Sequence, residues 1–285
     1  MRLLLVDGAN FAHRARAGFD RGPNAFIFNF FRNLRALVEF VKPDSVIYVL
    51  EGKPVARNEM HSEYKANRAI APDDPDHERK TNERNEFFNS YDKCISLLQK
   101  AFPVSIMRHP THECDDVIHN IAVQEAGKSQ QDQPNEIVIV SSDTDFIQSL
   151  QAHQNIKLYN ATKKQWVEAP EYDYVAWKSL RGDGSDNISG IPGVGDKTAT
   201  KLMTSQTLAQ FLQSDPEKAR VFERNTNLIK FHEFTKEDWE GLVVHHGTAD
   251  WLQVKNAFDE YKFASILKEK SWDKFTSTFD KASTK

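Results

Sequence analysis

Short apolar runs recur along the first part of the chain, and most of them are separated by enough residues to form a helix. The runs are residues 3–6, 45–50, 104–107, 137–141 and 156–159. Strands that alternate with helices pair into a mainly parallel sheet whose faces the helices cover. Residues 24–41 carry apolar side chains at helical spacing. The sequence therefore predicts an α/β fold with a mostly parallel central sheet flanked by helices.

Two regions depart from this alternation. Residues 52–90 are polar and rich in Lys, Arg and Pro, and they are too long for a plain connection, so they form either a functional excursion or a disordered insert. After residue 169 we expect no further strands, only helices at residues 171–181, 197–203, 208–212, 217–231 and 249–268. We therefore expect an α/β core at residues 1–175, with an insertion at about 52–90, followed by a helical lobe and C-terminal helices at residues 176–285.

Composition excludes several classes of protein. The chain has 37 Lys and Arg against 41 Asp and Glu, a net charge of −4, which argues against a simple basic coat for nucleic acid but not against a nucleic-acid enzyme. Two cysteines cannot build a disulfide framework, which favours a reducing compartment. No apolar stretch approaches the roughly 18–20 residues of a membrane span. We therefore expect a cytoplasmic protein with no membrane contact.

Acidic residues follow the expected strands. The carboxyl ends of parallel strands meet at one edge of a sheet, where such sheets bind their ligands. An acid in one of these places alone is usually a turn or cap residue, but so many carboxylates at one edge are tolerated only with bound cations. The candidate metal ligands are Asp7, Glu51, Glu113, Asp115, Asp116, Asp143, Asp145, Asp183 and Asp186.

The ligand chemistry indicates the ion and the reaction. Oxygen ligands without paired His or Cys suit Mg²⁺, with Mn²⁺ as a substitute, rather than zinc. Two or more such ions close together would activate a water and stabilise the leaving oxygen in phosphodiester cleavage. The sequence therefore predicts a divalent-metal phosphodiesterase site.

A glycine-rich segment follows the last two acids. Gly190-Ile-Pro-Gly-Val-Gly-Asp-Lys-Thr-Ala199 has the pattern of a helix–hairpin–helix, whose tight turn lets backbone amides approach a phosphate. The alternative is an ordinary Gly-rich turn between helices. The predicted DNA-binding residues are Tyr64, Gly190, Gly193, Val194, Gly195, Lys197, Thr198 and Lys201.

Basic side chains lie near the expected metal site. Lys65 and Arg68 follow Tyr64 in the polar excursion, which leaves the sheet directly after Glu51. They could neutralise charge on a scissile phosphate, and Arg14 could do so from the other side; taken alone, they are ordinary solvated charges.

Together these segments resemble the flap endonuclease, or 5′ nuclease, family, and the likeness is closest to small phage-type enzymes that stand alone without a polymerase. The segments are Val6-Asp-Gly-Ala-Asn10, Tyr64-Lys-Ala-Asn-Arg68, Glu113-Cys-Asp-Asp116, Ser142-Asp-Thr-Asp145 and Gly182-Asp-Gly-Ser-Asp-Asn187 with the hairpin. The resemblance covers roughly residues 1–205. It implies a PIN-like core, a helical arch and a helix–hairpin–helix (H3TH) lobe.

The resemblance also implies roles for individual residues. Lys65 would be the active-site lysine at the base of the arch, with Arg68 beside it, and K⁺ could bind carbonyls of the hairpin. Asp7, Glu113, Asp115 and Asp116 would hold the first metal, and Asp143, Asp145, Asp183 and Asp186 the second. Two departures are Glu51, where the family usually has Asp, and Cys114, where it has Ala. We interpret Cys114 as a packing residue.

We therefore expect a monomeric Mg²⁺-dependent 5′→3′ exonuclease and flap endonuclease that acts on branched or 5′-flap DNA without sequence preference, in DNA replication or repair. Its location would be the cytoplasm, which is the host's if the chain is phage-encoded. The alternatives are a PIN-like RNase and a branched-DNA-binding module that has lost catalysis. A phosphatase with an aspartyl nucleophile is less favoured, because Asp7 is followed by Gly-Ala-Asn.

Overall fold

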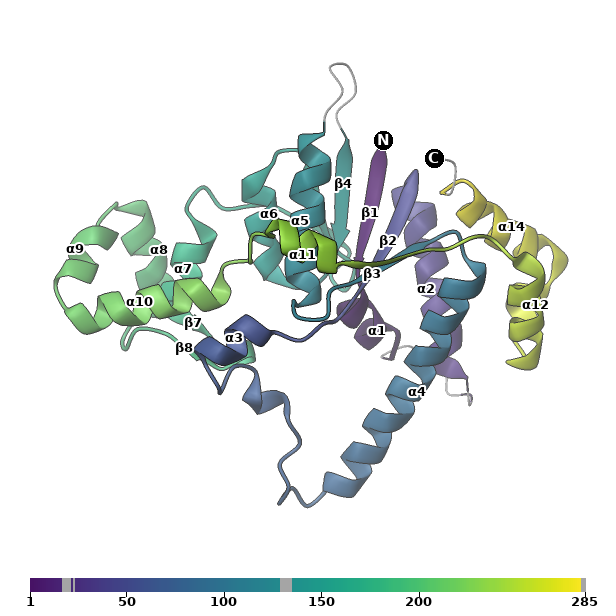
Figure 1. Cartoon of the computed structure of the whole chain (residues 1–285), viewed down its shortest axis with the longest axis horizontal. Helices are drawn as coiled ribbons and strands as arrows, with labels where there is room; N and C mark the ends of the chain where they lie inside the picture. The colour runs from purple at the N-terminus through teal and green to yellow at the C-terminus, as the bar shows by residue number, and fades with distance from the viewer. Residues whose placement is uncertain (17–21, 23, 129–134, 283–285) are drawn as a thin grey trace.

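The computed structural model describes residues 1–16, 22, 24–128 and 135–282. A seven-stranded sheet in the order β6-β5-β4-β1-β2-β3-β9 forms its centre (Figure 1). Its strands are β1 (Arg2–Asp7), β2 (Ser45–Leu50), β3 (Ser105–Arg108), β4 (Glu136–Val140), β5 (Ile156–Asn160), β6 (Gln165–Val167) and β9 (Val243–His246). The five inner strands are parallel, and β6 and β9 pair antiparallel at the two edges. The predicted mostly parallel α/β sheet is confirmed.

The central strand β1 divides the core into two halves. Leu4 pairs in register with Val46 of β2 and Val138 of β4, and all three face one layer of helices. Leu3 and Leu5 point to the opposite layer. This alternation follows from the two-residue period of a strand, and it requires apolar side chains at every position of a strand covered on both faces.

The first layer of helices contains the end of the chain. It consists of α1 (Gly8–Arg16), α2 (Ala25–Val41), α4 (His77–Ala101), α12 (Trp251–Glu260), α13 (Ala264–Leu267) and α14 (Glu269–Asp280). Phe258 of α12 lies 5.2 Å from Phe31 of α2 between ring centroids, and Phe279 of α14 lies 5.1 Å from Phe102. Figure 1 shows α12 and α14 beside α2 and α4, far from α8 to α10. The structure thus places residues 251–282, which are among the expected C-terminal helices, in the main core and not beside the lobe.

The opposite face of the sheet carries α5 (Cys114–Gly127), α6 (Ile147–Ala152) and α11 (Lys236–Gly241). Val117 and Ile121 of α5 pack against Leu5 and Ile139 of the sheet. Because α5 follows β3 directly, its first turn lies at the carboxyl edge of the strands.

The remaining helices form a lobe with its own small core around Leu180, Ile191 and Ala199. The lobe contains α7 (Tyr174–Arg181), the two-residue strands β7 (Gly182–Asp183) and β8 (Ile188–Ser189), α8 (Asp196–Thr204), α9 (Leu208–Gln213) and α10 (Pro216–Ile229). The expectation of no strand after residue 169 is therefore wrong for β7, β8 and β9. β9 has four residues, all exposed, and pairs with the edge of the sheet at β3. Its sequence therefore lacks the alternation of apolar and polar residues by which a strand is recognised.

The polar excursion after Glu51 is folded onto the lobe. It contains α3 (Val55–Met60) and a 3₁₀ turn, η1 (Ala66–Arg68), before α4 returns to the core (Figure 1). The Lys65 amide donates to the Asp186 carbonyl at 3.0 Å, and Asn67 Nδ2 donates to the Gly184 carbonyl at 2.9 Å. Of the two interpretations of this segment, a functional excursion therefore fits the structure. Among the described residues, no helix combines the length and apolarity that crossing a membrane requires.

We expect Phe258→Ala to lower the free energy of unfolding by about 3–5 kcal/mol, because this ring is fully buried between α2 and α14. The matched control is Leu252→Ala on the same helix, where the side chain is 71% exposed and the expected change is within about 0.5 kcal/mol. Urea unfolding followed by circular dichroism measures both. Equal small effects would contradict the docking of α12 against the core.

Candidate metal centre

The first group of acids forms where β1 and β4 end side by side. Asp7 is the last residue of β1; its Oδ2 accepts from Ser141 Oγ at 2.7 Å and its Oδ1 from the Asn10 amide at 3.0 Å. Asp115 enters from the first turn of α5, and one donor atom from each of Asp7, Cys114 and Asp115 lies within 4.8 Å of the others. The sheet register therefore brings together acids that are far apart in sequence.

Burial disfavours the ionised form of the acids in this group. Desolvation, reinforced by Asp7 and Asp143, raises the pKa of Asp115 far above its usual range. Desolvation also raises the pKa of Asp7. Carboxylates that are crowded in this way ionise readily only when a cation neutralises them.

A second group of acids lies beside the first. Donor oxygens of Asp145, Asp183 and Asp186 lie within 4.8 Å of one another. Lys178 of α7 contacts Asp145, and its Nζ is 2.5 Å from Asp183 Oδ2. Burial, opposed by Lys178, raises the pKa of Asp145 to about 7. For Asp183, the contacts with Lys178 and Ser185 outweigh burial and lower the pKa to about 2.

Glu113 connects the two groups. Its carboxylate contacts Lys65 Nζ and lies 3.0 Å from the Tyr64 hydroxyl, which is also 3.1 Å from Asp186 Oδ2. Lys65 Nζ lies 3.6 Å from that same Asp186 oxygen. Tyr64 is buried against Ile188 of β8, so the structure places this predicted DNA-binding residue inside the site rather than on a surface.

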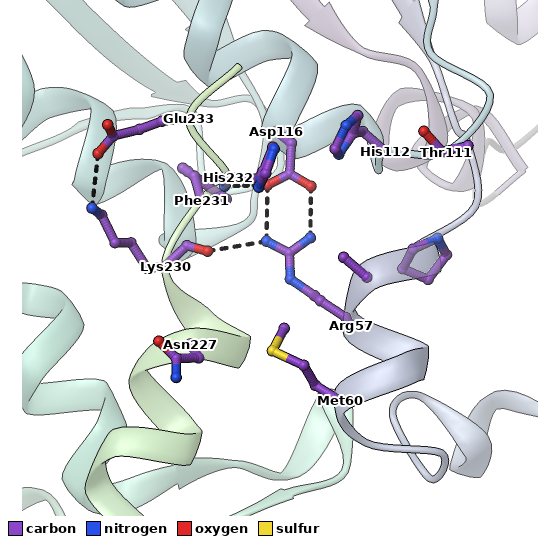
Figure 2. A pocket seen from close by; sticks show the side chains of 12 residues that line it. Arg57, Met60, Thr111, His112, Asp116, Asn227, Lys230, Phe231, His232 and Glu233 are labelled. Atoms are coloured by element: carbon purple, nitrogen blue, oxygen red, sulfur yellow. Dashed lines mark hydrogen bonds and ion pairs between the residues drawn. The ribbon is translucent and has the colours of Figure 1, made fainter. Parts of the chain in front are cut away.

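Asp116 is held in a buried ion pair with Arg57. Both of its oxygens accept from the Arg57 guanidinium, at 2.6 and 2.8 Å, and Oδ1 also accepts from the His232 amide at 2.9 Å (Figure 2). Arg57 further donates to Glu113 at 2.7 Å. Despite its burial, Asp116 has a lowered pKa because Arg57 holds it ionised. The structure thus ties this predicted ligand into a buried ion pair and does not bring it to the shared edge.

Glu51 and Cys114 occupy the two positions that depart from the family pattern. Glu51 Oε1 accepts from the Cys114 amide at 3.2 Å. The residue keeps access to solvent, yet the protein packed around its carboxylate and the charge of Glu113 raise its pKa to about 7. Burial raises the pKa of the Cys114 thiol, which packs with the apolar core under α5. Cys114 therefore stays protonated and packs, as the sequence suggested.

Eight acids thus gather at the carboxyl edge of the sheet, and we call them the carboxylate pit. They are Asp7, Glu51, Glu113, Asp115, Asp143, Asp145, Asp183 and Asp186. Their oxygen donors match the preference of Mg²⁺ and similar hard cations.

The predicted basic residues divide into two sets. Arg68 reaches the pit, with Nη2 2.5 Å from Asp186 Oδ1. Arg14 does not: its guanidinium lies over the Phe11 ring and donates to the Ala161 carbonyl at 3.4 Å. Helix α1 turns Arg14 toward β5, while His13 faces the pit side.

A cleft of about 530 Å³ opens from the pit between α1, the excursion and α4. Glu51, Lys65 and Glu113 line its inner end, whereas Arg84 and Phe87 line the part along α4. The cleft therefore joins the acids to a basic and aromatic wall.

The hairpin between α7 and α8 is exposed. Gly190 approaches the Arg181 carbonyl so closely that a Cβ would lie 2.1 Å from it, and Gly193 has a φ of +79°. Lys197, Thr198 and Lys201 at the start of α8 are exposed. These glycines give the tight turn that the motif predicts, and basic side chains lie beside it on the surface of the lobe.

Two functional residues escaped sequence reasoning. Lys178 lies four residues after the buried Tyr174, on the helix face that packs against the protein and where an apolar residue is expected. A lysine at such a position indicates a buried acidic partner, and this could have been recognised in the sequence. Arg57 has no such signal, because its partners Glu113 and Asp116 come from a distant helix.

Comparisons with known proteins identify relatives of this chain. The model of the 5′-3′ exonuclease N-terminal resolvase-like domain family matches residues 2–176. DNA polymerase I of Synechocystis sp. is 27% identical over 230 residues, which cover 70% of this chain and 22% of the polymerase. The chain thus spans about a quarter of the length of the curated relatives that it matches.

Solved structures share the fold. A zinc-bound 5′-exonuclease of bacteriophage T5 matches with a TM-score of 0.66 at 17% identity, over 99% of this chain and 100% of the other. A flap endonuclease of the same phage, in a complex with DNA and metal ions, gives 0.64 at 18% identity over the whole of both chains. The sheet, with helices on both faces, is therefore the predicted PIN-like, resolvase-like fold. The chain belongs to the 5′-3′ exonuclease family defined by that N-terminal domain.

Proposed function

We propose that this chain is a structure-selective 5′ nuclease that hydrolyses phosphodiester bonds of DNA near junctions between single strand and duplex, as a 5′→3′ exonuclease and flap endonuclease. One observation carries the proposal: the carboxylate pit opens into a basic, aromatic cleft, and the exposed hairpin follows directly in the chain after its last two acids. Family membership and the flap endonuclease named among the structural neighbours support it.

The pit would hold two divalent ions, Mg²⁺ by preference and Mn²⁺ as a substitute. Asp7 and Asp115 would hold the first, with Glu113, Glu51 and Asp143 around it, and Asp145, Asp183 and Asp186 the second. Bound there, the ions would supply an activated water and neutralise the leaving oxygen. We assign Asp116 to holding Arg57 rather than to ligation.

The chain's own cations would act on the scissile phosphate. Lys65 and Arg68 both contact Asp186 and both line the cleft, so they can pair with a phosphate that enters there. Lys178 contacts Asp145 and Asp183 and would orient these carboxylates. Arg14 has no such position, and we assign it no catalytic role.

The DNA would be held on both sides of the pit. Hairpin amides with Gly190, Gly193, Val194 and Gly195, and the side chains of Lys197, Thr198 and Lys201, would contact the duplex backbone without reading bases. K⁺ bound by hairpin carbonyls fits this role. The cleft along Arg84 and Phe87 would take the single-stranded arm, with a base stacking on the aromatic wall. We further propose that the protein acts as a monomer in the cytoplasm, the host's if phage-encoded.

The hairpin favours this proposal over a PIN-like RNase, since it offers a grip for a DNA duplex. The complete pit with Lys65 favours an enzyme over a branched-DNA-binding module without catalysis. Cleavage of matched DNA and RNA flaps, under the same Mg²⁺ concentration, distinguishes all three.

We expect Asp143→Asn with Asp145→Asn to lower cleavage of a 5′-flap duplex in Mg²⁺ by at least about a hundredfold, because a carboxylate beside the first ion and a ligand of the second ion are both lost. Flap binding measured by anisotropy should persist. The control Asp273→Asn changes an exposed acid of α14 and should leave cleavage unchanged. Cleavage by the double variant at the wild-type rate would refute the assignment.

We expect the Mg²⁺ concentration for half-maximal cleavage to rise as the pH falls from 8 to 6. The pKa values of Glu51 and Asp145 are raised to about 7, so protons occupy these carboxylates below that pH and compete with the metal. The change should approach tenfold per pH unit for each proton displaced. Mg²⁺ titrations at saturating DNA measure it. A requirement that stays constant over this range would contradict the metal roles of both residues.

We expect Lys197→Ala with Lys201→Ala to weaken flap binding and to lower the slope of log affinity against log salt by about 2, because two phosphate contacts are lost. Binding is measured by anisotropy in Ca²⁺ across a KCl series. The control Lys236→Ala removes an 83% exposed lysine of α11. An unchanged slope would place the duplex elsewhere.

A further inference from the structure

Three histidines and an aspartate meet on the face of the molecule that carries α11, outside the carboxylate pit. His109 and His112 lie in the loop between β3 and α5, His232 follows α10, and Asp238 belongs to α11. The rings of His109 and His112 are 4.4 Å apart between centroids, and those of His112 and His232 are 4.6 Å apart. One donor atom from each of His109, His112 and Asp238 lies within 4.8 Å of the other two.

The Asp238 carboxylate is fixed in place. Its Oδ2 accepts from the Thr235 amide at 2.8 Å, from Thr235 Oγ1 at 2.9 Å and from His232 Nε2 at 3.1 Å. These bonds include the capping box that starts α11. Oδ1 is left to face His112 Nε2 at 2.8 Å. The helix cap thus presents one carboxylate oxygen to the histidines in a set orientation.

His109 has a buried nitrogen without a partner. The residue is 4% exposed, and its Nε2 has no hydrogen bond of normal geometry. Burial and the charge of His112 lower the pKa of the ring, although the carboxylate and backbone of Asp238 oppose this. A Cβ on Gly241 would lie 2.7 Å from Nε2, so only glycine leaves room for it. Nδ1 accepts from the Thr111 amide at 3.2 Å and lies 3.1 Å from Thr111 Oγ1. Nε2 therefore presents a lone pair to an ion once the ring proton moves to Nδ1, which then donates to Thr111 Oγ1.

A network of hydrogen bonds alone explains only part of this cluster. It accounts for His112 and His232, which share the Asp238 carboxylate. It does not account for His109, whose Nε2 is buried beside them with no hydrogen bond. Buried polar groups normally find a partner, so this ring nitrogen, which lies next to two other atoms that can ligate a metal, has the capacity to bind an ion.

We propose that this cluster is a site for one borderline transition-metal cation of the Zn²⁺ class, separate from the catalytic ions. His109 Nε2, His112 Nε2 and Asp238 Oδ1 would be its ligands. Two imidazoles and one carboxylate suit Zn²⁺ and not Mg²⁺. Binding would move the His112 ring proton from Nε2 to Nδ1, because the ion takes the place of the hydrogen bond between His112 and Asp238.

The surroundings supply the partners that such a site requires. Thr111 Oγ1 would orient the His109 ring through Nδ1, and His232 would orient Asp238 through Oδ2. A cavity of about 340 Å³, lined by Thr111, His112 and His232 among others, gives solvent a path to the cluster (Figure 2). A water can therefore complete a four-coordinate ion.

The ion would join two segments that are distant in sequence, the loop before α5 and the chain that includes α11. Residues 109–112 lead directly into Glu113 of the pit, and residues 230–241 connect the lobe to the core. The ion would therefore brace the loop before Glu113 against the chain that returns from the lobe, and its role is structural.

The test uses the full chain, freed of metal by a chelator and then kept in excess Mg²⁺, so that oxygen ligands of the pit are occupied. Calorimetric titration should show one Zn²⁺ bound, and Co²⁺ in its place should give the intense visible absorption of a four-coordinate ion rather than the weak bands of an octahedral one. His112→Gln and Asp238→Asn should each weaken Zn²⁺ at least tenfold and remove the Co²⁺ bands.

Two controls separate this site from the pit. Asp7→Asn with Asp115→Asn should bind Zn²⁺ as the wild type does, and so should His77→Gln, which changes an exposed histidine of α4. Circular dichroism checks that each variant is folded; if His112→Gln is not, Asp238→Asn on α11 decides. Zn²⁺ binding that survives Asp238→Asn, or that disappears only in the pit variant, overturns the proposal, as does a wild type that binds no Zn²⁺ in excess Mg²⁺.

Discussion

Repulsion among buried carboxylates is the constraint on which the rest of this structure depends. A parallel sheet brings its strand ends to one edge, and here that edge carries Asp7 and Asp143 beside Asp115 from α5. Desolvation and mutual repulsion raise the pKa of Asp115 so far that the protein needs compensating cations. It supplies them from elements outside the sheet, as Lys178 of α7 and Lys65 of the excursion.

Those compensating contacts also position the lobe. Lys178 bridges Asp145 of the core to Asp183 of the lobe, and Lys65 links Glu113 to Asp186 in the same way. Tyr64 fills the space between them, packed on Ile188. The excursion, the lobe and the sheet edge therefore meet at the acids, so a change in charge there, by metal or by proton, acts on all three at once.

The sequence predicted what is encoded in short-range patterns. The inner strands and the acids at their ends follow from apolar runs and the residue after each run, and the hairpin follows from spaced glycines. Contacts between distant segments were not predictable in this way: Arg57 pairs with Asp116 across 59 residues, and Phe258 docks on Phe31 from the other end of the chain. Tyr64 belongs to a motif, but a motif does not show whether its ring points to DNA or to the interior. β9 is too short and too exposed to leave any pattern.

The contrast between Asp115 and Asp116 shows how one helix start serves two purposes. Successive side chains on a helix point about 100° apart, so Asp115 turns to the sheet edge while Asp116 turns to Arg57. Asp116 also accepts from the His232 amide, and Asn120, one turn later, accepts from the Phe234 amide. The segment returning from the lobe is thus bonded along the outer face of α5. A movement of that segment is therefore transmitted to α5, the helix that carries Asp115. An ion bound at Asp238 would restrain the segment and, through its bonds to α5, help to hold Asp115 in place.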